Sequence, residues 1–227
     1  MQTVANPFSP SNDEVYNDLA ESRSSFESVL DDSVMALVEK ACVNIDSLNR
    51  FYALREQVLS WVKCELEFDA PPDNSMTWAG WGWQPYVNEP EIRIGLLRVY
   101  KNDSVPIHDH PGASGMLVIL EGELTLNEYQ LEQSDQYNQM QLASLSMTGQ
   151  QNLVSNQYAL ITPDQANLHS LSAASDVCII LDVLLTPYAE EQRSWFTPVT
   201  DKVICGQTFT AFRVDHQTFS NSIYQSG

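Results

Sequence analysis

Short apolar segments separated by turn residues fill the second half of the sequence and most constrain its fold. Six segments are predicted as strands, at residues 93–100, 106–110, 116–120, 123–129, 158–161 and 177–185. A polar turn follows the first of these, and the last two end at Pro163 and Pro187. Short strands at this spacing, with turn signals between them, are typical of an all-β sandwich or barrel.

The chain divides into three segments that together are expected to form one structural domain. Residues 1–22 are polar, and we expect a loosely ordered arm there. Residues 23–85 hold a helical segment and a Trp-rich connection, and they are too few to form a core alone. Residues 86–227 are the predicted barrel with its C-terminal tail. Within this part, residues 130–150 are rich in Gln, Ser and Met, which indicates a long hairpin or an exposed insertion.

Two amphipathic helices are expected in the N-terminal segment. Apolar side chains recur at steps of three and four residues over 26–41, and again over 48–62. Asp46 or Ser47 is the expected cap of the second helix, because both side chains can accept the first free N–H groups of a helix. Both apolar stripes are read as packing surfaces.

The connection that follows the helices contains a cluster of aromatic side chains. The stretch TWAGWGWQPY, residues 77–86, has three tryptophans in seven residues. Such a cluster can line a ligand or partner surface. It more often covers the edge of a core, and we favour that interpretation.

The charge balance excludes several classes of partner. The chain has 30 acidic and 11 basic side chains and a net charge of -19, which repels phosphate backbones and anionic membranes. No apolar run approaches the length of a membrane span, and the first residues lack the basic and apolar regions of a signal peptide. The four cysteines are far apart and form no CxxC pair. We therefore expect a cytoplasmic monomer with reduced thiols and with no nucleic-acid or membrane partner.

Half of the histidines stand within three residues. The chain has four, and His108 and His110 lie in VPIHDHPGASGMLVILEG, residues 105–122. Side chains at i and i+2 of a strand share a face, so both imidazoles could bind one metal ion at about 2.0–2.1 Å. His169, in ITPDQANLHSL, is the candidate third ligand, and His216 in the tail is the remaining histidine. The alternative is a pair of surface or hydrogen-bonded histidines.

These segments resemble the two motifs of the cupins, which are double-stranded β-helix barrels. The first cupin motif is HxH, then a glutamate, then Gly, and the second is a Pro-Gly-type turn followed by His. Ser114 occupies the expected glutamate position and Gly115 follows it, so the site resembles the three-histidine set of the thiol dioxygenases. The stretches IHDHPG and NLHSLSAASDVCIILDVLLTPY are similar to segments of plant cysteine oxidases and cysteamine dioxygenase. The resemblance covers residues 92–196.

The resemblance implies a fold, an iron site and an activity. The implied fold is mainly β, a cupin double-stranded β-helix (jelly-roll) barrel with N-terminal helices packed on it. His108, His110 and His169 match the Fe(II) ligands. The implied reaction adds both atoms of O2 to the sulfur of a small, amine-bearing thiol or cysteine derivative and gives a sulfinate. Three neutral imidazoles leave positions open on the iron, and a metal lowers the pKa of a bound thiol until it is deprotonated.

The resemblance also implies residues that act beside the iron. Asp182 matches the aspartate of LDVL, which assists catalysis in the relatives and could hydrogen-bond the substrate amine or a ligating histidine; the alternative is a turn-capping aspartate. Tyr188 matches a family tyrosine, with an aromatic lid on the barrel as the alternative. Arg98, with Arg93, is the arginine available on the first strand for a substrate carboxylate. Gly115 stands where animal cysteine dioxygenases have a cross-linked cysteine, so no cross-link is expected.

Two other functions stay open at this point. A different metal-dependent cupin enzyme, such as an isomerase or a dioxygenase that cleaves carbon bonds, usually keeps the glutamate that is missing here. A non-catalytic cupin that binds a ligand or partner would be favoured by the loss of a metal histidine, and none is lost. The identity of the thiol also stays open. An amine-bearing thiol is favoured over an anionic one because the chain is acidic and Asp182 is expected near the metal.

Overall fold

The computed structural model describes residues 12–67, 76–78, 80–132, 142–186, 192–199 and 203–224. Its helices are α1 (Asn12–Lys40), α2 (Ile45–Glu67) and α3 (His216–Tyr224). Its strands are β1 (Met76–Trp78), β2 (Trp81–Asn88), β3 (Ile92–Tyr100), β4 (Ser104–Asp109), β5 (Ser114–Glu121), β6 (Glu123–Leu131), β7 (Leu142–Val154), β8 (Tyr158–Ile161), β9 (Leu168–Ala173), β10 (Val177–Leu185), β11 (Ser194–Pro198) and β12 (Thr208–Asp215).

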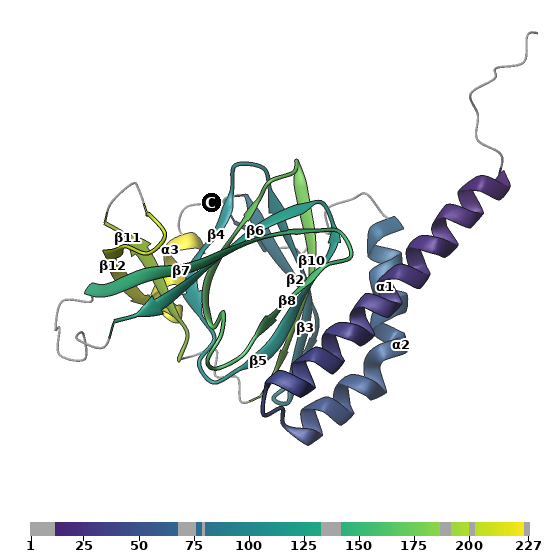
Figure 1. Cartoon of the computed structure of the whole chain (residues 1–227), viewed down its shortest axis with the longest axis horizontal. Coiled ribbons are helices and arrows are strands. Elements are labelled where there is room, and N and C mark those ends of the chain that lie inside the picture. Colours follow the sequence, from purple (N-terminus) through teal and green to yellow (C-terminus); the bar gives the residue numbers. More distant parts are fainter. Residues whose placement is uncertain are drawn as a thin grey trace, which may run out of the picture.

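Two antiparallel sheets form the body of the protein (Figure 1). The first sheet has the strand order β1-β2-β3-β10-β5-β8. The second has the order β11-β12-β7-β6-β9-β4 and closes on itself because β4 also pairs with β11. From β3 to β6 and from β7 to β11, successive strands alternate between the two sheets, so the chain winds around a common axis. The fold is therefore mainly β, a double-stranded β-helix barrel with N-terminal helices, and the predicted fold class is confirmed.

β10 shows how the barrel separates two cores. The odd-numbered residues from Ile179 to Leu185 belong to the core beneath the helices. On the opposite side of the strand, Cys178 and Leu184 belong to the core inside the barrel. This is the two-residue period of a strand that is buried on both faces. Asp182 has the parity of the interior side, so its carboxyl interrupts an apolar face inside the barrel.

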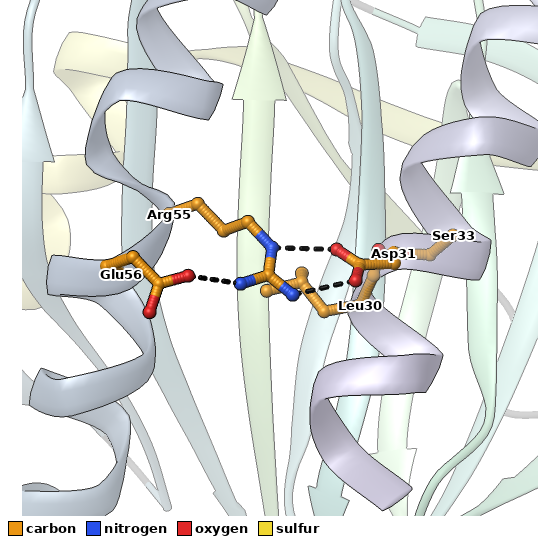
Figure 2. Close-up of polar contacts among 5 residues, drawn as sticks. All are labelled: Leu30, Asp31, Ser33, Arg55 and Glu56. Atoms are coloured by element: carbon orange, nitrogen blue, oxygen red, sulfur yellow. Dashed lines mark hydrogen bonds and ion pairs between the residues drawn. The ribbon is translucent and has the colours of Figure 1, made fainter. Parts of the chain in front are cut away.

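α1 and α2 lie side by side on the outer face of the first sheet (Figure 1). Leu30 and Leu37 of α1 and Phe51 of α2 are among the largest fully buried side chains, and each such burial stabilises the fold by about 1.5–3 kcal/mol. Arg55 of α2 donates two hydrogen bonds of 2.7 Å to Asp31 of α1 and a third to its neighbour Glu56 (Figure 2). An ion pair at the surface contributes about 1 kcal/mol or less to stability, and this one joins the two helices to each other. The helices are therefore held on the sheet by their apolar contacts.

Both helices begin earlier than the sequence predicts. α1 starts at Asn12, inside segment 1–22 that is expected to be a loose arm. The sequence prediction relies on a stripe of apolar side chains. Residues with adequate helix propensity can extend a helix without such a stripe, so the first turns of α1 were not predicted. α2 starts directly after Asn44, whose side-chain Oδ1 accepts the N–H groups of Asp46 and Ser47 at 2.9 and 3.2 Å. Asn44 is therefore the cap in place of either predicted residue.

Several strands lie outside the six segments that are predicted as strands. β2 falls in the Trp-rich connection and pairs with β3. β7 pairs with β6, and the two strands form a long hairpin. A hairpin was one of the two expectations for residues 130–150, of which residues 133–141 lie outside the described part. In the tail, β11 pairs with β4 and β12 pairs with β7, so the tail is part of the second sheet. No helix in the described part is both long enough and apolar enough to cross a bilayer.

Gly115 stands on β5 where the neighbouring strand leaves no room for a side chain. It pairs with Leu184 of β10 and shares the interior side of β5 with Leu117. A Cβ at this position would lie 2.4 Å from the carbonyl oxygen of Val183 and 2.8 Å from Cδ2 of Leu184. Contacts this short require the two strands to separate. The position that could have held a cross-linked cysteine is therefore closed to any side chain.

Gly115→Ala is expected to lower the free energy of unfolding by about 1–3 kcal/mol, because the added methyl group overpacks the contact between β5 and β10. Gly149→Ala is the matched control on β7, since its Cβ would meet nothing closer than 3.7 Å. It should change the free energy of unfolding by less than about 0.5 kcal/mol. Urea denaturation followed by circular dichroism measures both variants. Equal losses would show that the close approach at Gly115 has no energetic consequence.

Candidate metal centre

A bulge in β4 turns its two histidines toward the barrel interior. Between the positions of Val105 and His108, β4 takes three residue steps where its partner β9 takes two. Val105 packs in the interior core, and regular alternation would place the odd-numbered residues after it on that same side. The extra residue reverses the alternation, so that the imidazoles of His108 and His110 face inward.

The third predicted histidine completes a compact triad. His169 of β9 is the direct cross-strand partner of His108. The ring centroids are 4.8 Å apart for His108 and His110, 4.6 Å for His108 and His169, and 5.0 Å for His110 and His169. One nitrogen from each ring lies within 4.8 Å of the others, and all three residues are buried. The structure thus brings together the three residues that the sequence proposes as ligands.

All three imidazoles are neutral at physiological pH. Burial lowers the pKa of each below its ordinary value of 6.5, and for His169 it lowers the pKa to about 4. The positive charge of Arg193 acts in the same direction on each ring. A metal ion binds the neutral imidazole, so the buried triad is already in the form that coordinates.

Backbone carbonyls orient two of the rings. Nδ1 of His108 lies 2.8 Å from the carbonyl oxygen of Pro106, and Nδ1 of His169 lies 2.6 Å from that of Ala166. A carbonyl only accepts, so each Nδ1 carries the proton and each Nε2 offers a lone pair. Ala166 has a φ of 52°, an unusual backbone conformation for a residue other than glycine or asparagine. Such carbonyl partners are typical of metal-binding histidines.

His110 is held through its backbone and through its ring. Asn167 donates from Nδ2 to the carbonyl oxygen of His110 at 2.6 Å, and its backbone carbonyl accepts the His110 N–H at 3.1 Å. Because Asn167 stands two residues before His169, it ties together the segments that carry the ligands. On the ring side, Arg193 Nη2 donates to Nδ1 of His110 at 3.1 Å. No role for Asn167 or Arg193 is predicted from the sequence.

Asp109, between the two histidines, points away from the triad and ties β4 to the C-terminal part of the barrel. Its Oδ1 accepts the backbone N–H of Ser194 at 2.6 Å. Burial raises the pKa of the Asp109 carboxyl, while the Ser194 N–H and nearby arginines act in the opposite direction. Since Arg193 directly precedes Ser194, this bond also fixes the backbone that carries Arg193 beside the triad.

Trp195 of β11 joins the triad to the C-terminal helix. Its indole stacks on the His108 ring with centroids 4.8 Å apart and on Phe219 of α3 with centroids 3.9 Å apart. Its Nε1–H donates to Nδ1 of His216 at 3.2 Å. His216 thus lies close to the site, although it is not a member of the histidine triad. The tail therefore supplies one wall of the site.

Asp182 occupies the opposite wall, on β10. Its partner on β3 is Gly95, where a Cβ would lie only 2.5 Å from the Trp83 ring, so the missing side chain makes room for the indole. The Arg93 guanidinium stacks on Trp83 at 3.9 Å from the ring centroid. Burial raises the pKa of Asp182, while Arg93, Arg193 and the nearby Trp83 N–H act to lower it. Oδ1 of Asp182 is buried and accepts no hydrogen bond from any residue that the structure describes.

The triad and both walls enclose a cavity of about 410 Å³. Besides the three histidines, its lining includes Trp81, Trp83, Arg93, Leu117, Asp182, Arg193, Trp195, His216 and Ser220. Two tryptophans of the TWAGWGWQPY stretch therefore face the cavity, where the sequence favours a core edge. The aromatic walls leave few polar groups to compete with the triad for a ligand.

Two predicted site residues are not part of this arrangement as described. Arg98 has the opposite parity to Arg93 on β3, so it points out of the barrel, donates to Gln84 at 2.8 Å and lies 3.6 Å from Glu65 of α2. Among the described residues, Arg93 lines the cavity and Arg98 does not, so a substrate contact of Arg98 finds no support in this geometry. Tyr188 lies outside the described residues, and its role stays a prediction.

The donor set fits a first-row transition metal. Three imidazole nitrogens suit Fe(II), Zn(II), Cu(II) or Ni(II), whereas Mg(II) and Ca(II) prefer oxygen ligands. Ser114 is buried at the place of the expected glutamate, and no carboxylate joins the triad among the described residues. Three ligands on one side of an ion leave its other positions for exogenous molecules.

Comparison with known proteins shows several to which this chain is similar. A model of the PCO_ADO family matches residues 86–199, half of the chain. A protein of Dictyostelium discoideum named "Probable 2-aminoethanethiol dioxygenase" is 22% identical over 161 residues, which cover 68% of this chain and 70% of that protein. A cupin superfamily protein of Desulfitobacterium hafniense is 12% identical with a TM-score of 0.34, covering 52% of this chain and 83% of the other. A Klebsiella pneumoniae protein with a double-stranded β-helix domain is 13% identical with a TM-score of 0.34, covering 52% and 79%.

The fold and the histidine triad together define the class of protein, and the family model then defines the family within it. An inward-facing histidine triad in a double-stranded β-helix barrel belongs to the metal-binding cupins. Within that class, the chain is a member of the PCO_ADO family of cupin thiol dioxygenases. The resemblance seen in the sequence is thereby confirmed at the level of the family.

His169→Ala is expected to abolish binding of one Fe(II) per chain, because two imidazoles do not hold the ion in this cavity. His216→Ala is the matched control, since it removes the remaining histidine near the cavity without touching the triad. Metal content after anaerobic loading and desalting measures both. A stoichiometry near one ion for His169→Ala would refute the ligand set.

Proposed function

We propose that this protein is a non-haem Fe(II) dioxygenase that oxidises a small thiol to a sulfinate. The observation that carries the proposal is a buried triad of neutral imidazoles in the wall of a cavity, a cluster that no carboxylate of the described residues joins. Membership of the PCO_ADO family supports the thiol as the group that is oxidised. When bound, Fe(II) would supply the open positions and the redox chemistry that bring a thiolate and O2 together. The expected cytoplasmic location and monomeric state stay predictions.

The proposed reaction balances without an external reductant. A thiol R–SH and O2 give the sulfinic acid R–SO2H, in which both oxygen atoms are bonded to sulfur. The S–H bond and the O–O bond break and two S–O bonds form. Sulfur loses four electrons and O2 gains four. The thiol proton ends on the product, or in solvent as the sulfinate ionises.

The protein's own residues hold, orient and shield the reacting groups. His108, His110 and His169 would bind the ion on one side through nitrogens that burial keeps unprotonated. A carboxylate ligand would add negative charge that the thiolate itself supplies in this chemistry. The indoles of Trp83 and Trp195 line the cavity and exclude water from the reacting sulfur.

Asp182 is the residue we assign to the substrate amine. Its Oδ1 is buried and accepts no hydrogen bond within the described part of the chain, and the carboxyl lines the same cavity as the triad. An ammonium group there would gain a charge-assisted hydrogen bond. The seat of Trp83 over Gly95 fixes the indole next to this carboxyl. Tyr188 stays assigned as a second catalytic residue by family resemblance alone.

The other two functions are less well supported. Metal-dependent cupins of other activities usually have a carboxylate ligand, and Ser114 and Gly115 offer none. A non-catalytic cupin has no need to keep three buried imidazoles neutral and oriented by carbonyls. Each such imidazole costs free energy at low pH, because its proton affinity is lower in the folded state than in the unfolded chain.

The Fe(II)-loaded full chain is expected to consume O2 with at least one of four thiols: cysteine, cysteamine, 3-mercaptopropionate and a peptide with N-terminal cysteine. One sulfinate should form for each O2 consumed, because both oxygen atoms enter the product. An oxygen electrode and mass spectrometry of the product with ¹⁸O2 measure this. His169→Ala loaded in the same way is the control. Iron binding without O2 consumption on any of the four thiols would refute the proposal.

Asp182→Asn is expected to lower kcat/KM for cysteamine by about 10- to 100-fold while iron content is unchanged, because the neutral amide lacks the negative charge that pairs with an ammonium group. Asp176→Asn is the matched control, since Asp176 is exposed in a turn and pairs with Lys101 at 2.7 Å. Steady-state O2 uptake on each variant measures the effect. Full activity of Asp182→Asn would assign the carboxyl a structural role only.

A further inference from the structure

The C-terminal helix α3 forms part of the cavity wall. It begins at His216 because Asp215 caps it: the two carboxylate oxygens of Asp215 accept the backbone N–H and the hydroxyl of Thr218 at 2.8 and 2.7 Å. His216 and Ser220 line the cavity, whereas Gln217 and Thr218 are exposed. Residues three and four positions apart share one face of a helix. α3 thus has the cavity on one side and solvent on the other.

Two side chains of this helix hold the Trp195 indole. Phe219 stacks on the indole, with ring centroids 3.9 Å apart and planes only 10° apart. His216 accepts the indole N–H at its Nδ1 over 3.2 Å. The stacked phenyl ring fixes the plane of the indole, and the hydrogen bond fixes its rotation within that plane. The position of Trp195 therefore depends on α3.

The indole that α3 holds lies against one of the metal-binding histidines. Trp195 stacks on the His108 ring with centroids 4.8 Å apart, and the Trp81 indole lies 6.1 Å from it on the same wall. Trp81 and Trp195 both line the cavity. The position of Trp195 therefore decides how much space remains beside the triad for a molecule that binds there.

The space that remains suits a small molecule. The cavity volume of about 410 Å³ lies near the lower end of the range for ligand pockets, which is about 300–1,000 Å³. Protein interiors are densely packed, and a side chain removed from them leaves a void that its neighbours refill only in part. Loss of the Phe219 ring would therefore give the indole room to move away from His108. The cavity would become larger on the side of α3.

We propose that α3 sets the upper size limit of the substrate. It holds Trp195 beside His108, which leaves room for a free small thiol and blocks the passage to solvent that the chain of a peptide with N-terminal cysteine would need. Phe219 and His216 are positioning residues that act on the substrate through the indole. The inference rests on the proposed function and narrows its substrate class. It concerns a part of the chain after residue 199, where the match to the family ends.

The turnover test compares two substrates that differ in length: cysteine amide and a pentapeptide amide of cysteine followed by four glycines. Both have one thiol, one amine and no carboxylate. With the Fe(II)-loaded full chain, kcat/KM is expected to be at least tenfold higher for cysteine amide. Phe219→Ala should raise the ratio of the peptide value to the cysteine amide value at least fivefold. A general loss of structure would lower both values and would not favour the longer substrate.

Phe212→Ala is the matched control, because it removes a phenyl ring that is 51% exposed on the neighbouring strand β12. It should keep the wild-type ratio. His216→Ala removes the hydrogen bond to the indole and should raise the ratio in the same direction, so it decides the question if Phe219→Ala does not fold. A wild-type preference for the peptide, or an unchanged ratio in the folded variant, would overturn the role of α3.

Binding without turnover separates this inference from the proposed function. The chain is loaded with Co(II), which three imidazoles also bind, and both thiols are titrated under nitrogen while the cobalt–thiolate absorption is recorded. Phe219→Ala should shift the ratio of the two Kd values toward the peptide at least fivefold, and Phe212→Ala should not. An unchanged Kd ratio would refute the size limit, whether or not a thiol is oxidised. A shifted ratio without oxidation of any thiol would refute the proposed function and leave the size limit in place.

Discussion

The pairing of β4 with β9 at His108 and His169 is the constraint on which the site depends. Two ligands become direct neighbours across strands, and the bulge before His108 turns the imidazoles of the HxH motif inward. Side chains on a strand alternate with a period of two, so a slip of one residue would turn both histidines of β4 to the other face. Asn167 resists such a slip. It stands two residues before His169 and forms hydrogen bonds with the backbone of His110.

Missing side chains shape the cavity as much as present ones. At Gly115, β5 and β10 approach too closely for any side chain, and this excludes a cysteine at that position. At Gly95, the space that a side chain would fill is taken by the Trp83 indole, which stacks on Arg93 and lies next to Asp182. Both glycines act through packing, since neither has a positive φ. The three-histidine site thus follows from backbone geometry as well as from the identity of its ligands.

Much of the barrel could be predicted from the sequence because its central strands are apolar on both faces. β8 and β10 have the predicted bounds for this reason, and the histidine triad was predicted from the HxH spacing together with the resemblance to the thiol dioxygenases. The bulge in β4 could not be predicted, because an extra residue leaves no trace in composition. The choice between Arg93 and Arg98 depended on which residues of β3 face the barrel interior. Both faces of that strand are apolar, so the sequence does not show which face is which. The segment around Arg193 is short and without period, so nothing in it pointed to the cavity.

The net charge of the chain does not distinguish two electrostatic effects. One is the long-range field of the acidic surface, and the other is the set of charged groups that line the cavity. An excess of acidic groups acts over distance through water, where ions screen it within about 10 Å at moderate ionic strength. Inside the cavity, the charges that decide binding are those of a few groups in contact with the ligand, and there Arg93 and Arg193 outweigh Asp182. The field of the whole protein therefore says little about the groups that a small ligand meets inside the cavity. Those groups are placed by the pairing of the strands, and composition alone does not contain that information.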